Sequence, residues 1–272
     1  GYLYKGYTIQ PYSPAAGTGL STHELNQPGA YRDVKDTTCV AQFKIKSPKA
    51  EMSQFGDAYF LAWTTTPWTL PSNTALAVGP DITYVAVQSY NPYTGNKMTA
   101  VLAKWLMFSM FNEKAKDVAL EDYKQGDKLI PYKIVGEWKG SDLVGMEYEQ
   151  LIPWMNPGKG AFRVLGGDFV TTDDGTGIVH IAPTFGADDA RVAKENGVPA
   201  LLLLDKDGNQ RPMVDLTGKY FRLEDIDPEY LKTNVNVDLY KEYAGRYVKN
   251  EYDDTLPADA NTLDICLLYT SD

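Results

Sequence analysis

The sequence predicts an α+β fold in which short strands form a β-barrel-like core and a few helices lie at its periphery. Short apolar runs recur along the chain and are separated by glycine, proline and asparagine, as is typical of strands joined by turns. Segments with the apolar spacing of a helix are few and short. With 272 residues, 43% of them hydrophobic, the chain can bury the core of one large domain.

The first half of the chain is predicted to contain four strands and one helix. The strands are residues 37–46, 59–64, 83–89 and 97–103. The last two flank Asn91-Pro-Tyr-Thr-Gly-Asn96, a turn sequence that predicts a hairpin. Residues 104–116 follow, with Trp105, Phe108 and Phe111 at helical spacing, and we predict a helix there.

The second half is predicted to contain more short strands and two helices. The strands are residues 136–138, 143–151, 161–170, 177–182 and 200–204. Residues 171–176 join two of them, and we interpret this pair as a second hairpin. A short helix over 188–196 ends before Gly197, because glycine favours the C-terminal cap. One further helix is predicted within residues 224–247.

The chain is predicted to have four parts. Residues 1–35 are rich in glycine, proline, serine and tyrosine, and we predict a linker or the edge of a neighbouring domain. The core is predicted over 36–215, followed by a return segment over 216–250. Residues 251–272 continue no predicted element. We assign them as an uncertain tail, for which non-native sequence is one interpretation.

Charge and cysteine content exclude several classes of protein. The net charge of −10 disfavours tight autonomous binding of nucleic acid, although a local basic patch remains compatible with it. Cys39 and Cys266 are the only cysteines, and no CxxC pair exists, so we expect no zinc site and a cytosolic protein. No apolar run approaches ~18 residues and no leader is visible, so we expect no contact with a membrane.

The segment Trp63-Thr-Thr-Thr-Pro-Trp-Thr-Leu-Pro-Ser-Asn73 is the first candidate site. Three consecutive hydroxyls on a stiff, β-branched backbone can orient a water molecule and bind a ribose without any charged group. The alternative interpretation is a strand end and proline turn, with Trp63 and Trp68 packed in the core. Asn73 would then be an ordinary turn residue.

The segment Gly175-Thr-Gly-Ile-Val-His-Ile-Ala-Pro-Thr-Phe-Gly-Ala-Asp-Asp189 is the second candidate. It contains His180, one of two histidines, at the end of a predicted strand, where sites are often built; a half-buried structural histidine is the alternative. Asp188 and Asp189 begin a predicted helix, where one aspartate serves as a cap and the other is free to pair with an ammonium group. The motifs of covalent serine or cysteine hydrolases and of metalloproteases are absent.

Together, these two segments resemble the signature segments of the editing domain of isoleucyl-tRNA synthetase, in the same order and at a similar separation. The resemblance extends more weakly from about residue 3 to about residue 250. Related valyl and leucyl enzymes usually carry an arginine in the threonine segment; Thr66 followed by Pro67 favours the isoleucyl type, with the valyl and leucyl types as alternatives. The HIGH and KMSKS signatures of the synthetic site are absent. We therefore expect no cofactor or metal in this chain, and ATP and Mg only in a separate catalytic domain.

The resemblance implies an aminoacyl-tRNA deacylase with the editing-domain fold of the valyl, isoleucyl and leucyl enzymes. Valine lacks one methylene of isoleucine, a difference worth about 1–3 kcal/mol as measured on this enzyme family itself, so a second, smaller pocket must destroy Val-tRNA(Ile). The implied catalytic residues are Thr65, His180 and Asp189, of which Asp189 binds the α-ammonium group. The implied substrate-binding residues are Thr64, Thr66, Trp68, Thr69, Asn73 and Asp189.

Two other functions remain open. The chain could be a non-catalytic module that binds the acceptor end of tRNA, or a hydrolase of free aminoacyl esters or adenylates. The resemblance implies two partners, the acceptor end of tRNA(Ile) carrying valine and the rest of a synthetase polypeptide. We expect a monomer in the cytoplasm.

Overall fold

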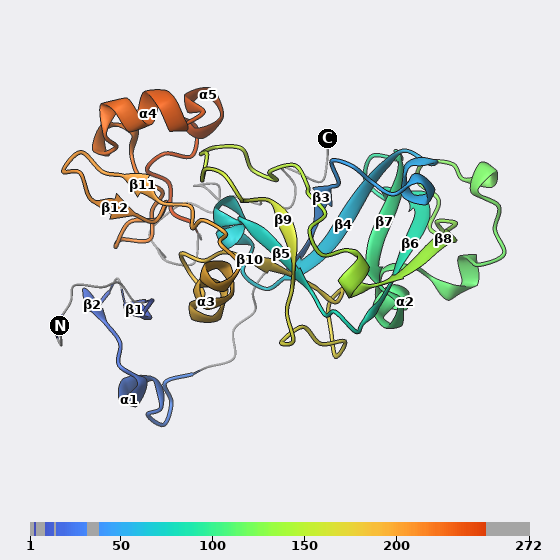
Figure 1. Ribbon diagram of the computed structural model, residues 1–272, viewed down its shortest axis with the longest axis horizontal. Coiled ribbons are helices and arrows are strands. Elements are labelled where there is room, and N and C mark those ends of the chain that lie inside the picture. The colour runs from blue at the N-terminus through green and yellow to red at the C-terminus, as the bar shows by residue number, and fades with distance from the viewer. Residues whose placement is uncertain (1–2, 4–8, 14, 32–37, 249–272) are drawn as a thin grey trace. The chain divides into compact units, whose positions relative to one another are not determined.

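The computed structural model describes residues 3, 9–13, 15–31 and 38–248, which fold into two compact units (Figure 1). The first, here called the sheet unit, contains residues 38–152 and Lys159–Ile181. The second, here called the helical unit, contains the described residues of 3–31, Pro153–Gly158 and residues 182–248. The predicted tail, 251–272, lies outside the described residues, and the predicted division at 36, 216 and 251 stays a prediction.

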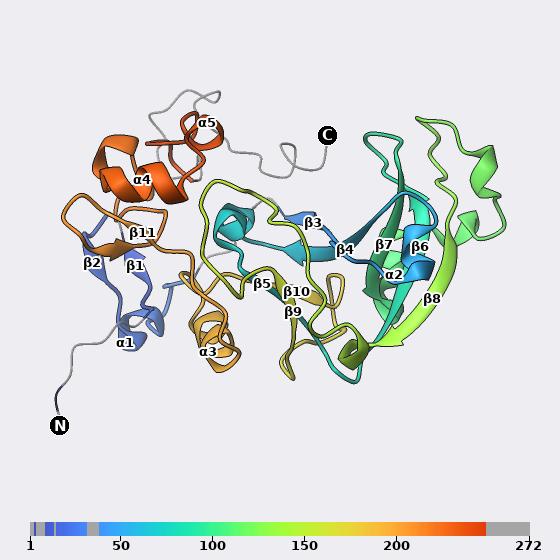
Figure 2. The same ribbon diagram turned by 45° about the horizontal axis from the view of Figure 1, so that its top comes forward.

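Five strands form the main sheet of the sheet unit, in the order β3-β4-β7-β6-β8 (Figure 2). They are β3 (Cys39–Lys44), β4 (Asp57–Thr64), β7 (Lys97–Ala103), β6 (Thr83–Tyr90) and β8 (Lys133–Lys139). β4 and β7 pair in parallel and the other neighbours are antiparallel. The strands predicted here and the β6–β7 hairpin are confirmed, but within the described residues the sheet ends at β3 and β8 and does not close into a barrel.

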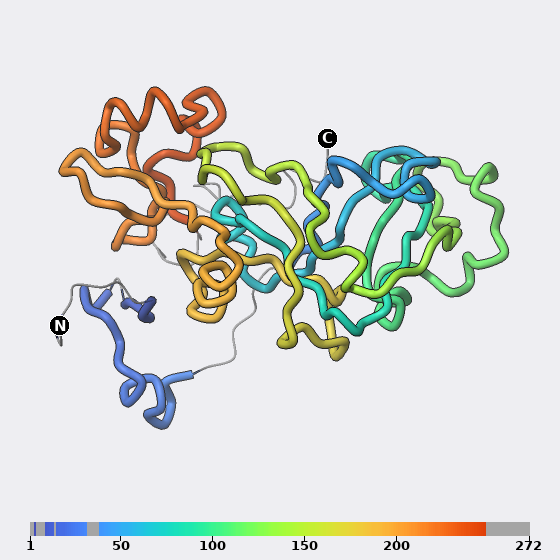
Figure 3. The backbone as a smooth tube through the Cα atoms, in the orientation of Figure 1, coloured from blue at the N-terminus to red at the C-terminus, as the bar shows by residue number. Residues whose placement is uncertain are grey.

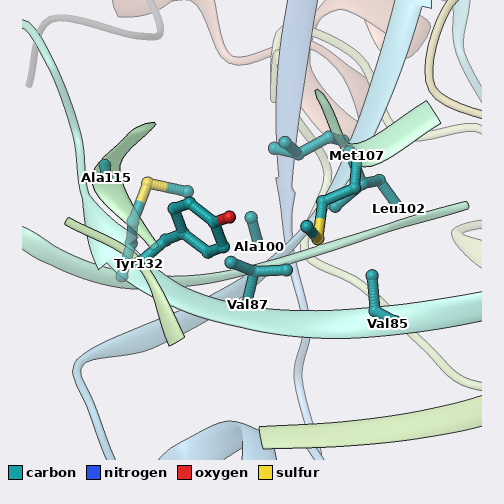
Figure 4. Close-up of a cluster of buried hydrophobic side chains, with 9 residues drawn as sticks. Val85, Val87, Ala100, Leu102, Met107, Ala115 and Tyr132 are labelled. Carbon is teal, nitrogen blue, oxygen red and sulfur yellow. The ribbon is translucent and has the colours of Figure 1, made fainter. Parts of the chain in front are cut away.

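One face of this sheet carries an apolar cluster (Figure 4). β4, β6 and β7 contribute Leu61, Val85, Val87, Met98, Ala100 and Leu102. The segment between β7 and β8, drawn in green in Figure 3, covers the cluster with Met107, Ala115 and Tyr132. The cluster therefore holds an irregular segment against the sheet by burial of apolar surface.

The helix predicted over residues 104–116 is wrong. The chain there forms three single turns, η3 (Lys104–Leu106), α2 (Met107–Met110) and η4 (Glu113–Ala115). Trp105 and Phe108, which produced the helical spacing, are 82% and 53% exposed, so their periodicity does not mark a buried face. The Asn112 side chain accepts a hydrogen bond from the Lys114 N–H and starts a new turn.

Three strands form a second sheet in the order β10-β5-β9, and two predictions for this part of the chain are corrected. The strands are β10 (Ile178–Ile181), β5 (Ala75–Val78) and β9 (Arg163–Gly166). The predicted hairpin of β9 with β10 is wrong, because β5 lies between them and pairs with both. Residues 143–151, predicted as a strand, contribute only single bridges at Glu147 and Tyr148.

The helical unit is built from short elements. They are β1 (Tyr12–Ser13), β2 (Thr18–Gly19), α1 (Thr22–Leu25), α3 (Ala187–Glu195), β11 (Leu203–Leu204), β12 (Gln210–Arg211), η7 (Leu223–Asp225), α4 (Pro228–Asn234) and α5 (Val237–Tyr240). The helix predicted over 188–196 is confirmed as α3. Within 224–247, where one helix was predicted, α4 confirms it and α5 is a second, additional helix.

The buried Trp154 organises the core of the helical unit. Its ring stacks on Tyr243 and meets the rings of Tyr220 and Tyr240. Four short 3-10 turns in the sheet unit complete the elements: η1 (Ala50–Ser53), η2 (Pro67–Ser72), η5 (Leu120–Asp122) and η6 (Gly140–Asp142). Many short strands and few helices confirm the predicted α+β class. No described helix is both long and apolar enough to cross a membrane.

Candidate functional site

The threonine segment begins where β4 ends, at Thr64, and turns directly into η2. Pro67 is the first residue of η2, where its missing N–H group costs no hydrogen bond. The Thr66 N–H group donates to Thr64 Oγ1 at 3.1 Å, and Thr69 Oγ1 donates to the Thr66 carbonyl at 2.8 Å. The hydroxyls of Thr64 and Thr69 therefore shape this turn as well as being candidates for substrate binding.

The four threonines differ in their exposure. Thr64 and Thr69 are buried, whereas Thr65 and Thr66 are exposed. Thr64 Oγ1 lies 3.4 Å from Thr66 Oγ1, so one of these two hydroxyls can donate a hydrogen bond to the other. The Thr65 hydroxyl makes no hydrogen bond within the part of the chain that the structure describes. Thr65 thus presents a free donor and acceptor at the surface of the segment.

The threonine segment and residues 175–181 of the second signature segment lie against each other in the sheet unit. The Trp63 N–H group donates to Thr176 Oγ1 at 3.3 Å. Gly175 has φ +72° and contacts the Trp63 ring, since a β-carbon at Gly175 would lie 3.0 Å from that ring. Thr69 Oγ1 lies 3.2 Å from His180 Nε2. Residues more than 100 positions apart in the sequence therefore form one hydroxyl and imidazole cluster, which we call the Thr–His cluster (Thr64, Thr65, Thr66, Thr69 and His180).

His180 is neutral, and its hydrogen bonds define its tautomer. Thr69 donates its single proton to the Thr66 carbonyl, so toward His180 it must accept, and Nε2 carries the imidazole hydrogen. The side chain is buried, and burial lowers the pKa of His180 to about 4. Nδ1 is then an unprotonated acceptor, and it is buried with no hydrogen-bond partner among the residues that the structure describes. A buried acceptor of this kind can receive a hydrogen bond from a ligand or a water molecule.

Asn73 is buried and its amide is engaged by the protein. Its Nδ2 donates to the Ala75 carbonyl at 2.8 Å and to the Ile181 carbonyl at 3.5 Å. Its Oδ1 accepts from the Tyr148 hydroxyl at 2.6 Å. These bonds tie the end of η2 to β5 and β10, so Asn73 stabilises the frame around the Thr–His cluster. Binding of substrate by Asn73, and by the half-buried Trp68, stays a prediction.

Sequence reasoning missed Tyr148, and no motif marks it. Burial raises the pKa of the Tyr148 phenol well above its ordinary range, so the hydroxyl remains a donor to Asn73. Its ring meets Phe43 and Phe162 edge to face. The contact with Asn73 joins residues that are 75 positions apart, which local patterns do not reveal.

Replacement of Tyr148 by phenylalanine is expected to lower the free energy of unfolding by about 1–3 kcal/mol, because Asn73 Oδ1 would remain buried without a donor. Urea denaturation of the purified chain measures this change. Tyr93→Phe is the matched control, since Tyr93 is 70% exposed and its variant should stay within about 0.5 kcal/mol of the unaltered chain. Equal stability of the two variants would contradict the assigned role of the Tyr148 hydroxyl.

Asp189 lies in the first turn of α3, within the helical unit. Its Oδ2 accepts a hydrogen bond from the Ala182 N–H group at 2.8 Å, which closes the loop between them. Burial raises the pKa of Asp189, the Ala182 hydrogen bond opposes the shift, and the charge of Asp188 adds to it. Its other oxygen has no partner among the described residues and can accept from a ligand ammonium.

Across the described residues, no group of three or more His, Cys, Asp or Glu side chains is placed to hold a metal ion. The Thr–His cluster consists of neutral groups, so its chemistry rests on hydrogen bonds and on orientation of water.

Comparison with known proteins identifies aminoacyl-tRNA synthetases as the class to which this chain is similar. Nearly the whole of this chain matches isoleucyl-tRNA synthetases, which confirms the resemblance carried by the two signature segments. It is 70% identical to isoleucine–tRNA ligase of Bacteroides fragilis over 267 residues, 98% of this chain and 23% of that protein. It is 66% identical to the ligase of Porphyromonas gingivalis over 266 residues, 97% of this chain and 23% of that protein. The chain therefore spans about a quarter of these relatives.

The comparison with solved structures finds, among others, the two that follow. "The crystal structure of GlLeuRS-CP1" gives a TM-score of 0.43 at 16% identity and covers 66% of this chain and 74% of that chain. The P. knowlesi cytosolic leucyl-tRNA synthetase editing domain gives a TM-score of 0.42 at 14% identity and covers 58% of this chain and 62% of that chain. No family model matches the chain.

Proposed function

We propose that this chain is the post-transfer editing domain of an isoleucyl-tRNA synthetase and hydrolyses the ester of Val-tRNA(Ile) in the cytoplasm. The observation that carries the proposal is the hydrogen bond of Thr69 to His180, which joins the two signature segments into one cluster. The 70% identity to isoleucine–tRNA ligase over 98% of the chain supports the choice of synthetase. The partners in this proposal are the acceptor end of tRNA(Ile) and the remainder of the synthetase polypeptide.

The proposed roles follow the hydrogen-bonding capacity of each side chain. The exposed Thr65 and Thr66 hydroxyls bind the terminal adenosine and the ester, and Thr64 holds Thr66 in place. His180 borders the amino-acid side chain and limits its size. Asp189 binds the α-ammonium group with the carboxylate oxygen that Ala182 leaves free.

Hydrolysis in this proposal depends on orientation of water by neutral groups. His180 has a low pKa and is a weak base, so its unpartnered Nδ1 accepts a hydrogen bond from the water rather than a full proton. A threonine hydroxyl donates to the ester oxygen as negative charge develops on it. A ribose hydroxyl of the substrate is available to assist proton transfer. This arrangement requires no cofactor.

Release of valine from Val-tRNA(Ile), measured beside release of isoleucine from Ile-tRNA(Ile), tests the proposal. We expect the chain to release valine selectively. Replacing Thr65 by valine should slow release about tenfold or more, because it removes the free hydroxyl and keeps the shape of the side chain. His180→Ala should reduce valine release as well. Thr233→Val, at an exposed threonine of α4, is the matched control and should retain the original rate.

Three outcomes would contradict the proposal. Binding of Val-tRNA(Ile) without cleavage by the folded chain would indicate a non-catalytic acceptor-end module. Cleavage of small aminoacyl esters but not of tRNA would indicate a general esterase. If Thr65→Val and His180→Ala both release valine at the original rate, hydrolysis does not depend on the Thr–His cluster.

A further inference from the structure

A cavity of about 570 Å³ lies within the sheet unit, and none of the Thr–His cluster lines it. Its floor is apolar and comes from strands β4 and β7 through Leu61, Met98 and Ala100, all of which are buried. These side chains belong to the sheet face shown in Figure 4, where Ala100 is labelled. The cavity therefore lies between this sheet face and the segment that covers it, and its size is typical of small-molecule sites.

The walls of the cavity are aromatic and held in place by the protein. Tyr90 stacks on Tyr123 with ring centroids 4.2 Å apart, and its hydroxyl donates to the Leu120 carbonyl at 2.8 Å. Phe111 packs against Tyr132, and Trp63 contacts Gly175. Because these rings have fixed neighbours, the cavity offers a preformed apolar space suited to a flat ring.

Two polar groups at the cavity lack partners in the part of the chain that the structure describes. The half-buried Gln42 of β3 makes no hydrogen bond through its amide there, and the exposed Lys128 makes no ion pair. By contrast, the Ser89 hydroxyl, which also lines the cavity, already donates to the Pro131 carbonyl. A half-buried amide is costly to desolvate, so a ligand that bonds to it is favoured over an apolar one.

We infer that this cavity binds a small aromatic anion of the kind represented by a nucleoside monophosphate. The flat ring lies on the apolar floor between the aromatic walls, its polar edge bonds to the Gln42 amide, and the anionic group pairs with Lys128. This site is separate from the proposed deacylation. Trp63 nevertheless precedes Thr64 directly, so a bound ring would contact the strand end from which the Thr–His cluster begins.

Calorimetric titration of the chain with AMP, and separately with adenosine, tests the inference. We expect saturable binding at one site. Lys128→Gln should weaken AMP binding about three- to fivefold and leave adenosine unaffected, because only AMP carries the phosphate. Gln42→Leu should weaken both ligands. The matched control is Lys124→Gln, an exposed lysine that does not line the cavity, and it should change neither affinity.

Filling the cavity gives an independent measurement. Ala100→Leu extends the floor into the space and should abolish binding of both ligands, with circular dichroism reporting whether the variant folds. Absence of saturable AMP binding, or equal affinities for the original chain, Lys128→Gln and Gln42→Leu, would overturn the inference. Competition with a single-stranded RNA trinucleotide distinguishes the sources of the ligand: displacement of AMP indicates a nucleotide of an RNA chain, and no displacement indicates a free nucleotide.

Discussion

Lowering the pH from 7 to 4 is expected to reduce the free energy of unfolding by roughly 3 kcal/mol through His180 alone. The folded-state pKa of this histidine is about 4, below its ordinary value of 6.5, because burial disfavours the charged form. Below pH 6.5 the unfolded chain takes up a proton that the folded chain does not bind. The stability that His180 contributes is therefore fully present above its unfolded-state pKa of 6.5, is lost as the pH falls from there toward 4, and levels off below its folded-state pKa.

Urea denaturation at several pH values between 7 and 4 measures this effect when the original chain is compared with His180→Gln. Glutamine keeps an N–H donor toward Thr69 but does not titrate, so its variant should lose roughly 3 kcal/mol less over the same range. Other titrating groups contribute equally to both proteins. His23→Gln serves as the control, because His23 is the other histidine and is exposed on α1. An identical pH dependence in all three proteins would show that His180 is not buried in its neutral form.

Local sequence patterns predicted the strands that carry the candidate site. β4 and β10 are short apolar runs that end beside proline or glycine, and each was assigned from its own residues. The threonine segment was selected because three consecutive hydroxyls are hard to explain by packing alone, and His180 because it stands at a strand end, where sites are often built. The hydrogen bond between Thr69 and His180 could not be predicted without the fold, because it depends on the placement of β5 and η2 relative to β10.

The errors have two causes, non-local strand pairing and apolar side chains that remain exposed. β9 and β10 are close in the sequence and read as a hairpin, but β5 separates them, and its four-residue apolar run gave too short a signal. Within residues 104–116, the helical spacing came from aromatic side chains that remain exposed while Met107 and Ala115 reach the core. Periodicity reports a buried face only when the apolar residues themselves are buried.

Replacing Asp189 by asparagine is expected to slow valine release from Val-tRNA(Ile) by roughly tenfold to a hundredfold. In the proposed function, the carboxylate pairs with the α-ammonium group of the valyl ester, and asparagine removes the charge while retaining an oxygen for the Ala182 N–H group. The loss should therefore appear in hydrolysis rather than in the fold. Rates under single-turnover conditions, together with circular dichroism of the variant, separate these two effects.

The neighbouring carboxylate supplies a matched control for this substitution. Asp188 is exposed and forms an ion pair with Arg191 at 3.5 Å, so Asp188→Asn removes the same charge one position away and should retain most of the activity. Because burial raises the pKa of Asp189, valine release should fall as acid protonates this carboxylate at a higher pH than for an ordinary aspartate. Asp189→Asn should lack this acid inflection. Equal rates for the two asparagine variants would exclude Asp189 as the ammonium ligand and leave the Thr–His cluster to bind the valyl group alone.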